Sequence, residues 1–137
     1  MAHDLSRLRV AIADPSSFGQ NMLSDLLMDE GIKDIAKYGT GRELVVALMT
    51  DEFHLVLVDD ELPQFSAVEL AMLAKGTKAV PRFIALQSLL ARDDVAFLRG
   101  RGVDGVLLKP VAPKRFSALF RSLFKQTGAV HLAARAA

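Results

Sequence analysis

A strict alternation of short apolar segments with amphipathic segments is the feature of this sequence that most constrains its fold. Each apolar segment has the length of a strand, and each amphipathic segment repeats its apolar residues at the three- and four-residue steps of a helix. The expected strands are residues 8–13, 32–36, 55–58, 82–86 and 105–108. Strands separated by helices of this length pair in parallel through right-handed crossovers. The sequence therefore predicts an α/β fold in which a strand–helix unit occurs five times.

Capping residues mark the boundaries of the expected helices. Ser16 or Ser17 can cap the first helix and Gly31 ends it, while Thr40 can cap the second with Glu43 placed for a capping box. The apolar faces expected for the second and third helices are Leu44, Val45, Leu48 and Met49, and Val68, Leu70, Ala71, Leu73 and Ala74. The final helix has the clearest stripe: Phe116, Leu119, Phe120, Leu123 and Phe124. Such a stripe usually packs into the core, although part of it can serve a partner or a homodimer.

Length and composition exclude several classes of protein. The 137 residues fit one domain, expected over residues 1–126 with a tail at 127–137. Seventeen basic and sixteen acidic residues nearly cancel, so nothing favours sequence-independent DNA binding. The lack of cysteine excludes disulfides and thiolate metal sites and agrees with a reducing cytoplasm. The charged N-terminus is not a signal peptide, and no apolar run is long enough to span a bilayer, so we expect a soluble cytoplasmic protein.

Charged residues stand directly after three of the expected strands. Asp14 follows the first strand, Asp59, Asp60 and Glu61 follow the third, and Lys109 follows the fifth. Ligands of open α/β sheets bind beyond the carboxyl ends of the strands, so these side chains are expected to meet at one edge. Clustered carboxylates suit Mg²⁺, an ammonium can hold a phosphoryl oxygen, and a carboxylate can attack phosphorus. Aspartate after a strand is also common in turns, but four acids and a lysine at three strand ends favour a site.

Three stretches of the sequence form a recognisable set. An apolar run ends at Asp59, and Pro63 follows after three further residues. The last expected strand ends in the pair Lys109-Pro110, and the second helix begins with a Thr-Gly pair at Thr40. Together these stretches resemble the receiver domain of two-component response regulators, and the resemblance extends over nearly the whole chain.

The resemblance implies a (βα)5 flavodoxin-like, doubly wound parallel sheet with the strand order 2-1-3-4-5. It also implies that a histidine kinase or a histidine phosphotransfer protein phosphorylates Asp59, with Mg²⁺ held by Asp14, Asp59 and the backbone carbonyl of Glu61. Lys109 would pair with a phosphoryl oxygen and precede a cis bond to Pro110. Phosphorylation would then bias a two-state surface on the fourth helix, fifth strand and fifth helix, where a downstream protein binds.

Three positions depart from the pattern of that family. Ala13 stands where the family has the first of two acids, which is expected to weaken Mg²⁺ binding, although the Glu61 side chain can add an oxygen. Gln87 replaces the usual serine or threonine after the fourth strand, and its amide can still donate to a phosphoryl oxygen. Ser88 comes one residue late and is expected to point elsewhere, because side chains alternate along a strand. Val106 replaces the usual aromatic switch residue, so we expect the output to differ from the ordinary switch.

Two functional hypotheses remain open. The leading one is a stand-alone receiver that signals by protein–protein contact, and the other is a pseudo-receiver that binds a partner or ligand independently of phosphorylation. An enzyme of the same architecture finds no support, because neither a cofactor loop nor a nucleophile–base pair is visible. Arg92, Arg99 and Arg101 can bind a partner or an anionic nucleotide, although a solvated helix face is the simpler interpretation. His54 is expected at the surface.

Overall fold

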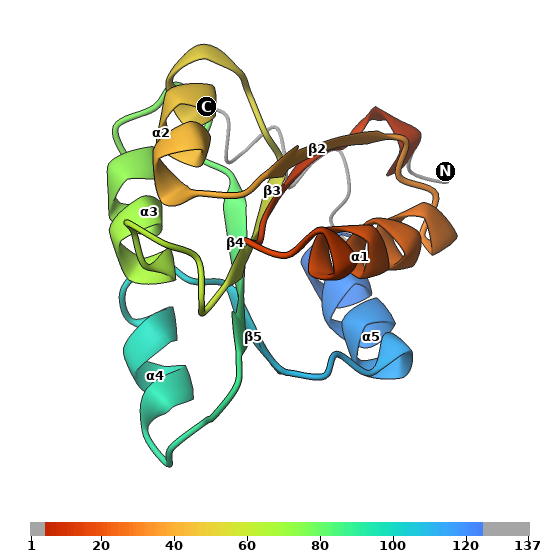
Figure 1. Cartoon of the computed structure of the whole chain (residues 1–137), viewed down its shortest axis with the longest axis vertical. Coiled ribbons are helices and arrows are strands. Elements are labelled where there is room, and N and C mark those ends of the chain that lie inside the picture. Colours follow the sequence, from red (N-terminus) through yellow and green to blue (C-terminus); the bar gives the residue numbers. More distant parts are fainter. Residues whose placement is uncertain (1–4, 125–137) are drawn as a thin grey trace.

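Five parallel strands form one sheet in the order β2-β1-β3-β4-β5, and helices cover both of its faces (Figure 1). The computed structural model describes residues 5–124. The strands are β1 (Arg9–Ala13), β2 (Asp34–Tyr38), β3 (Leu55–Asp59), β4 (Arg82–Gln87) and β5 (Gly105–Leu108). The helices are α1 (Ser17–Asp29), α2 (Gly41–Thr50), α3 (Ala67–Ala74), α4 (Asp94–Arg99) and α5 (Pro113–Phe124), with a short 3-10 helix at Leu5–Arg7. The expected flavodoxin-like fold and its strand order are confirmed.

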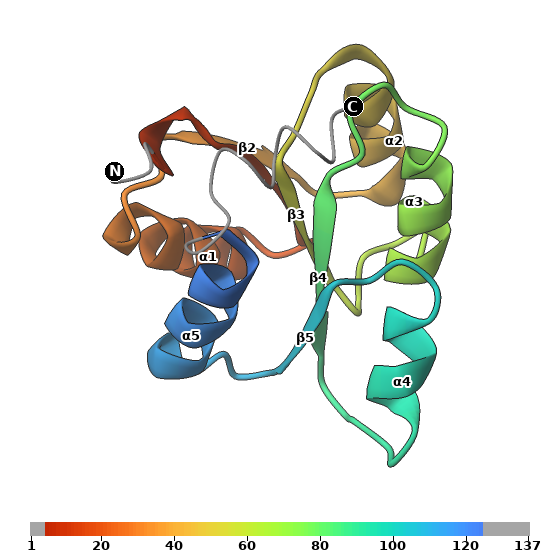
Figure 2. The same ribbon diagram turned by 180° about the vertical axis from the view of Figure 1, so that it is seen from behind.

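Two helical layers enclose the sheet. Helices α1 and α5 lie against one face, and α2, α3 and α4 lie against the other (Figure 2). Every residue of the central strand β3 is buried, because its side chains alternate between the two layers. Leu55 and Leu57 belong to the core under α1 and α5, whereas Val56 and Val58 belong to the core under α2 and α3. The continuous apolar run of β3 is therefore buried on both sides, as is usual for a central parallel strand.

Side-chain caps define where the helices begin. Ser16 caps α1 by accepting the backbone N–H of Gly19, and Thr40 caps α2 by accepting the N–H of Glu43. A full capping box that the sequence analysis did not identify opens α3, where Ser66 and Glu69 each accept the other's backbone N–H. These caps leave the preceding loops at the carboxyl edge of the sheet, where the charged residues lie.

The structure corrects several details of the expected elements. Strand β2 spans Asp34–Tyr38 instead of residues 32–36, because Ile32 closes the end of α1 through its N–H to the carbonyl of Leu27. Met49 and Leu73 are exposed, because the faces that α2 and α3 bury are centred on Leu44 and Leu48 and on Leu70 and Ala71. By contrast, the stripe on α5 packs into the core as expected, and its three phenylalanines are fully buried.

His54 is half-buried, so the expectation of a surface residue is wrong. It joins the starts of three strands, because its N–H donates to Arg9, its carbonyl accepts from Arg82, and its Nδ1 accepts the N–H of Arg9 at 2.8 Å. Within residues 5–124, no helix has the length and apolar character needed to cross a membrane. The predicted domain limit at 126 and the tail at 127–137 lie outside the described residues.

Candidate functional site

Asp14, Asp59 and Lys109 meet at the carboxyl edge of the sheet. Asp14 follows β1, Asp59 ends β3, and Lys109 follows β5, so the parallel topology delivers all three to one place. Both aspartates are only 5% exposed. The Nζ atom of Lys109 lies 2.8 Å from Oδ1 of Asp59. The structure thus brings together the three residues that the sequence analysis placed at the centre of the site.

Lys109 is held by two carboxylates at the same time. Its Nζ also lies 2.8 Å from Oδ1 of Asp60, and Oε2 of Glu61 is more distant at 3.9 Å. Burial alone would lower the pKa of Lys109, but the hydrogen bonds to Asp59 and Asp60 outweigh it and raise that pKa above its usual range. The peptide bond to Pro110 is cis, as expected. Lys109 therefore supplies a permanent positive charge beside Asp59.

Asp14 is a buried carboxylate with few compensating partners. Its Oδ1 accepts the N–H of Ser16 at 2.8 Å, and a Cβ at Gly19 would collide with the same carboxylate. Burial is the main cause that raises the pKa of Asp14, and the negative charges of Asp59 and Glu61 add to it. The N–H of Ser16 and the charge of Lys109 oppose this effect without cancelling it. An additional cation beside Asp14 and Asp59 would relieve this uncompensated charge.

Among the described residues, the metal-binding groups at this edge are hard oxygen donors. Asp14 and Asp59 supply carboxylates, and the N–H of Glu61 donates to Oδ2 of Asp59 at 2.9 Å. The Glu61 side chain is exposed, and residues 5–124 contain no group of three acidic, histidine or cysteine side chains arranged to hold a metal. The suggestion that the Glu61 carboxylate adds an oxygen to the site stays a prediction. Mg²⁺ commonly needs only one or two carboxylates and keeps several waters, so the remaining donor set still fits it.

Asp60 and Ser88 form a contact that the sequence analysis missed. Ser88 was expected to point away from the position that faces a phosphoryl group. Its N–H and hydroxyl donate to the two carboxylate oxygens of Asp60 at 2.7 and 3.3 Å. Burial raises the pKa of Asp60, but the hydrogen bonds from Lys109 and Ser88 outweigh it and hold that pKa below its usual range. Asp60 is thus an ionised link between Lys109 and the loop that follows β4.

The three positions that depart from the family pattern lie on β1, β4 and β5. Ala13 is fully buried in the core at the end of β1. Val106 is half-buried and packs against the same core from β5. Gln87 ends β4 and lines a cavity of about 370 Å³ together with Asp59 and Phe97. Gln87 and Asp59 therefore border the same cavity.

Comparisons with known proteins show which proteins this chain resembles in sequence. The sequence matches no family model. It is 26% identical over 121 residues to a probable chemotaxis protein CheY of Rhizobium etli, a match that covers 86% of this chain and 93% of that protein. It is also 34% identical over 62 residues to a protein-glutamate methylesterase/protein-glutamine glutaminase of Haloarcula marismortui. That second match covers 45% of this chain and 17% of the methylesterase, so it reaches only a small part of that protein.

Solved structures decide the fold. A CheY-like receiver domain protein of Methanospirillum hungatei aligns over 93% of this chain and 95% of its own length, with a TM-score of 0.72 and 20% identity. The chemotaxis response regulator CheY4 of Vibrio cholerae aligns over 85% and 98%, with a TM-score of 0.71 and 20% identity. This chain has the receiver fold of response regulators. The response regulator DrrB of Thermotoga maritima has a TM-score of 0.73 at 22% identity, and the match spans 52% of that chain.

The arginines around α4 lie at the surface of the protein. Arg92, Arg99 and Arg101 are all exposed. The guanidinium of Arg101 stacks over the ring of Phe97, one turn earlier, with its carbon 3.9 Å from the ring centroid. This contact gives Arg101 a local role just after the end of α4. A nucleotide or partner contact by these arginines stays a prediction.

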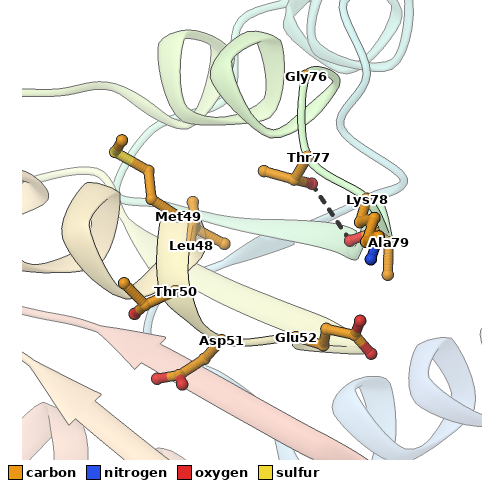
Figure 3. Close-up of a pocket in the computed structure, with 9 residues that line it drawn as sticks. All are labelled: Leu48, Met49, Thr50, Asp51, Glu52, Gly76, Thr77, Lys78 and Ala79. Carbon is orange, nitrogen blue, oxygen red and sulfur yellow. Dashed lines mark hydrogen bonds between the residues drawn. The ribbon is translucent and has the colours of Figure 1, made fainter.

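A second pocket lies at the opposite end of the strands from the acidic residues. It has a volume of about 380 Å³ and lies between the C-terminal ends of α2 and α3, near the start of β3 and β4 (Figure 3). Its lining includes Met49, Asp51, Glu52 and Lys78, and Thr77 donates to the carbonyl of Ala79 beside it. None of its lining residues belongs to the acidic edge.

Proposed function

We propose that this chain is a response regulator receiver in which Asp59 accepts a phosphoryl group from a phosphohistidine. The donor would be a histidine kinase or a histidine phosphotransfer protein, and the signal would pass on by protein–protein contact. The observation that carries the proposal is the placement of Asp59, which is buried at the end of β3 beside Asp14 and hydrogen-bonded to Lys109 at 2.8 Å. The similarity to a probable chemotaxis protein along most of the chain supports it.

The chemistry needs one nucleophile and charge stabilisation around phosphorus. A carboxylate oxygen of Asp59 attacks the phosphorus of the phosphohistidine, an O–P bond forms, and the P–N bond breaks. The electron pair of the P–N bond leaves with the imidazole, which takes a proton from solvent. The product is an acyl phosphate on Asp59. Lys109 holds a phosphoryl oxygen throughout, because its ammonium already lies beside the accepting carboxylate.

Mg²⁺ is part of this proposal, with Asp14, Asp59 and the backbone carbonyl of Glu61 as its ligands. The metal would neutralise negative charge on the phosphoryl oxygens. Asp14 is suited to this role because its carboxylate is buried near a second negative charge. Ala13 offers no carboxylate, so we expect weaker binding than a site with two acids after β1 would give.

Gln87 is the residue of this chain that can replace the usual hydroxyl beside the phosphoryl group. It shares a cavity with Asp59, and its backbone carbonyl accepts the N–H of Lys109 at 2.8 Å. An amide N–H donates a hydrogen bond as a hydroxyl does. The proposed downstream surface remains the one formed by α4, β5 and α5, where Val106 supplies no aromatic ring.

A two-step NMR titration tests the proposed function. Amide resonances near Asp14 and Asp59 should shift with Mg²⁺, and those near Asp59 and Lys109 should shift further with beryllofluoride, which mimics a phosphoryl group. The Asp59→Asn variant should lose the beryllofluoride response because the carboxylate that binds beryllium is gone. No response in the wild-type protein, or the same response in the variant, would refute the proposal.

A pseudo-receiver is the second candidate, favoured by one observation. Ala13 is buried among apolar core residues, so the metal site has lost one of the two acids that the family pattern places after β1. Such a protein would bind its partner constitutively or respond to another ligand. Cells carrying Asp59→Asn decide between the two: an intact signal favours the pseudo-receiver, and a lost signal at equal protein level favours the phosphorylated receiver.

A further inference from the structure

Asp60 makes contacts that link Asp59 to the loop between β4 and α4. Its side chain is 21% exposed and lies 2.8 Å from the ammonium of Lys109. On its other side it accepts the N–H of Ser88 at 2.7 Å. Its own N–H donates to the carbonyl of Leu86 in β4 at 2.9 Å, which fixes the backbone from which the carboxylate projects. Asp60 therefore has a defined position between the reacting group and the loop.

Lys109 is shared evenly between Asp59 and Asp60. Both Nζ–Oδ1 distances are 2.8 Å, and a lysine ammonium has three N–H donors, so one cation can serve both carboxylates. A phosphoryl group on Asp59 would add negative charge and acceptor oxygens next to Lys109. The ammonium would then be drawn toward the phosphoryl oxygens, and its hold on Asp60 would weaken. Asp60 would also be repelled by the added negative charge.

The loop after β4 depends on carboxylates at both of its ends. Ser88 bonds to Asp60 at one end, and Ala91 donates its N–H to Asp94 at 2.6 Å at the other. Between them, Leu89 is 84% exposed, and α4 beyond them buries only Leu98. A loop with so few apolar anchors will follow a change in its hydrogen bonds.

We propose that Asp60 is a positioning residue that couples the occupancy of Asp59 to the loop between β4 and α4. Lys109 holds Asp60, and Asp60 holds Ser88, so moving Lys109 toward a phosphoryl group shifts the start of the loop. This inference rests on the proposed function. It assigns the coupling to the carboxylate of Asp60, which directly follows β3. The two positions on β4 and β5 that depart from the family pattern carry Gln87 and Val106.

The first test measures amide hydrogen exchange of Ser88 in the protein without phosphoryl mimic. In Asp60→Ala, exchange of the Ser88 amide should accelerate by about tenfold or more, because a hydrogen bond to a charged acceptor is lost. Asp93→Asn is the matched control, since it removes an exposed carboxylate from the same loop that makes no capping hydrogen bond. Unchanged exchange in Asp60→Ala, or equal acceleration in both variants, would overturn the inference.

The second test adds Mg²⁺ and beryllofluoride and follows the amides of Ser88, Leu89 and Leu90. In the wild-type protein and in Asp93→Asn these amides should shift together with those near Asp59. In Asp60→Asn, which keeps the size of the side chain, the Asp59 response should persist while the shifts of the three loop amides fall by at least half. Equal loop shifts in Asp60→Asn would overturn the inference alone, whereas no response near Asp59 in the wild-type protein would overturn the proposed function as well.

Discussion

Asp14 carries a charge that the fold stabilises poorly. Because its pKa is raised, mainly by burial, the folded state binds the Asp14 proton more tightly than the unfolded state does. The contribution of Asp14 to the free energy of unfolding is therefore complete below its ordinary pKa, and it is lost as the pH rises through the raised pKa of the folded state. We expect Asp14→Asn to be more stable than the wild-type protein at pH 7 and to lose that advantage in acid. Urea denaturation at both pH values measures this, and an advantage that persists unchanged in acid would contradict it.

The same substitution should weaken Mg²⁺ binding, since it removes one of two carboxylates from the proposed donor set. A variant that is more stable but binds Mg²⁺ less well would show that the buried charge at Asp14 serves the site and not the fold.

His54 gives the fold a second pH dependence with the opposite sign. Burial is the main cause that lowers its pKa, and its Nδ1 must be unprotonated to accept the N–H of Arg9. Its contribution is therefore complete above its ordinary pKa of about 6.5 and is lost as the pH falls through the lowered value. We expect His54→Asn, which offers a non-titrating acceptor, to show a flatter decline of stability below pH 6.5. An identical decline in wild type and variant would contradict this.

At the scale of elements, the loop between β3 and α3 is attached to the start of α2. The N–H of Gly41 donates to the carbonyl of Pro63, and the N–H of Arg42 donates to the side chain of Gln64, whose φ is 84°. A Cβ at Gly41 would lie 2.9 Å from the backbone nitrogen of Phe65. The first turn of α2 thus holds the loop that follows Asp59.

Gly41→Ala should therefore destabilise the protein by about 1–3 kcal/mol, because the new methyl group forces the loop away from α2. Gly39→Ala is the control, since its Cβ would meet nothing closer than Glu43 at 3.8 Å. Chemical denaturation of both variants measures the difference. If the two substitutions cost the same, the attachment of the loop to α2 is not tight.

The elements also show where sequence reasoning succeeds and where it stops. Among the described residues, periodicity and capping residues identified the five strands and the five α-helices but not the short 3-10 helix at Leu5–Arg7. The shift of β2 depended on how Ile32 closes α1, and the contact between Asp60 and Ser88 depended on the path of a loop. Both are set by tertiary packing, which local sequence patterns do not predict. The meeting of Asp14, Asp59 and Lys109 was predictable because parallel topology alone brings strand ends together.

At the scale of the whole molecule, α5 packs beside α1 on one face of the sheet and buries three neighbouring aromatic rings there (Figure 2). Phe120 is fully buried, and its ring lies 6.1 Å from that of Phe116 and 5.1 Å from that of Phe124. Phe120→Ala should cost about 3–5 kcal/mol, a large share of the stability of a typical domain. Phe18→Ala removes a ring that is 76% exposed and should change stability by less than about 0.5 kcal/mol. Equal losses in thermal denaturation would contradict the two-layer core.

The most direct test of the account is whether Asp59 becomes phosphorylated. Purified protein would be incubated with Mg²⁺ and acetyl phosphate, and the intact mass and the peptide containing Asp59 would be measured by mass spectrometry. We predict one added phosphoryl group on that peptide in the wild-type protein and none in Asp59→Asn. No added phosphoryl group in the wild-type protein, or the same addition in Asp59→Asn, would contradict the central claim.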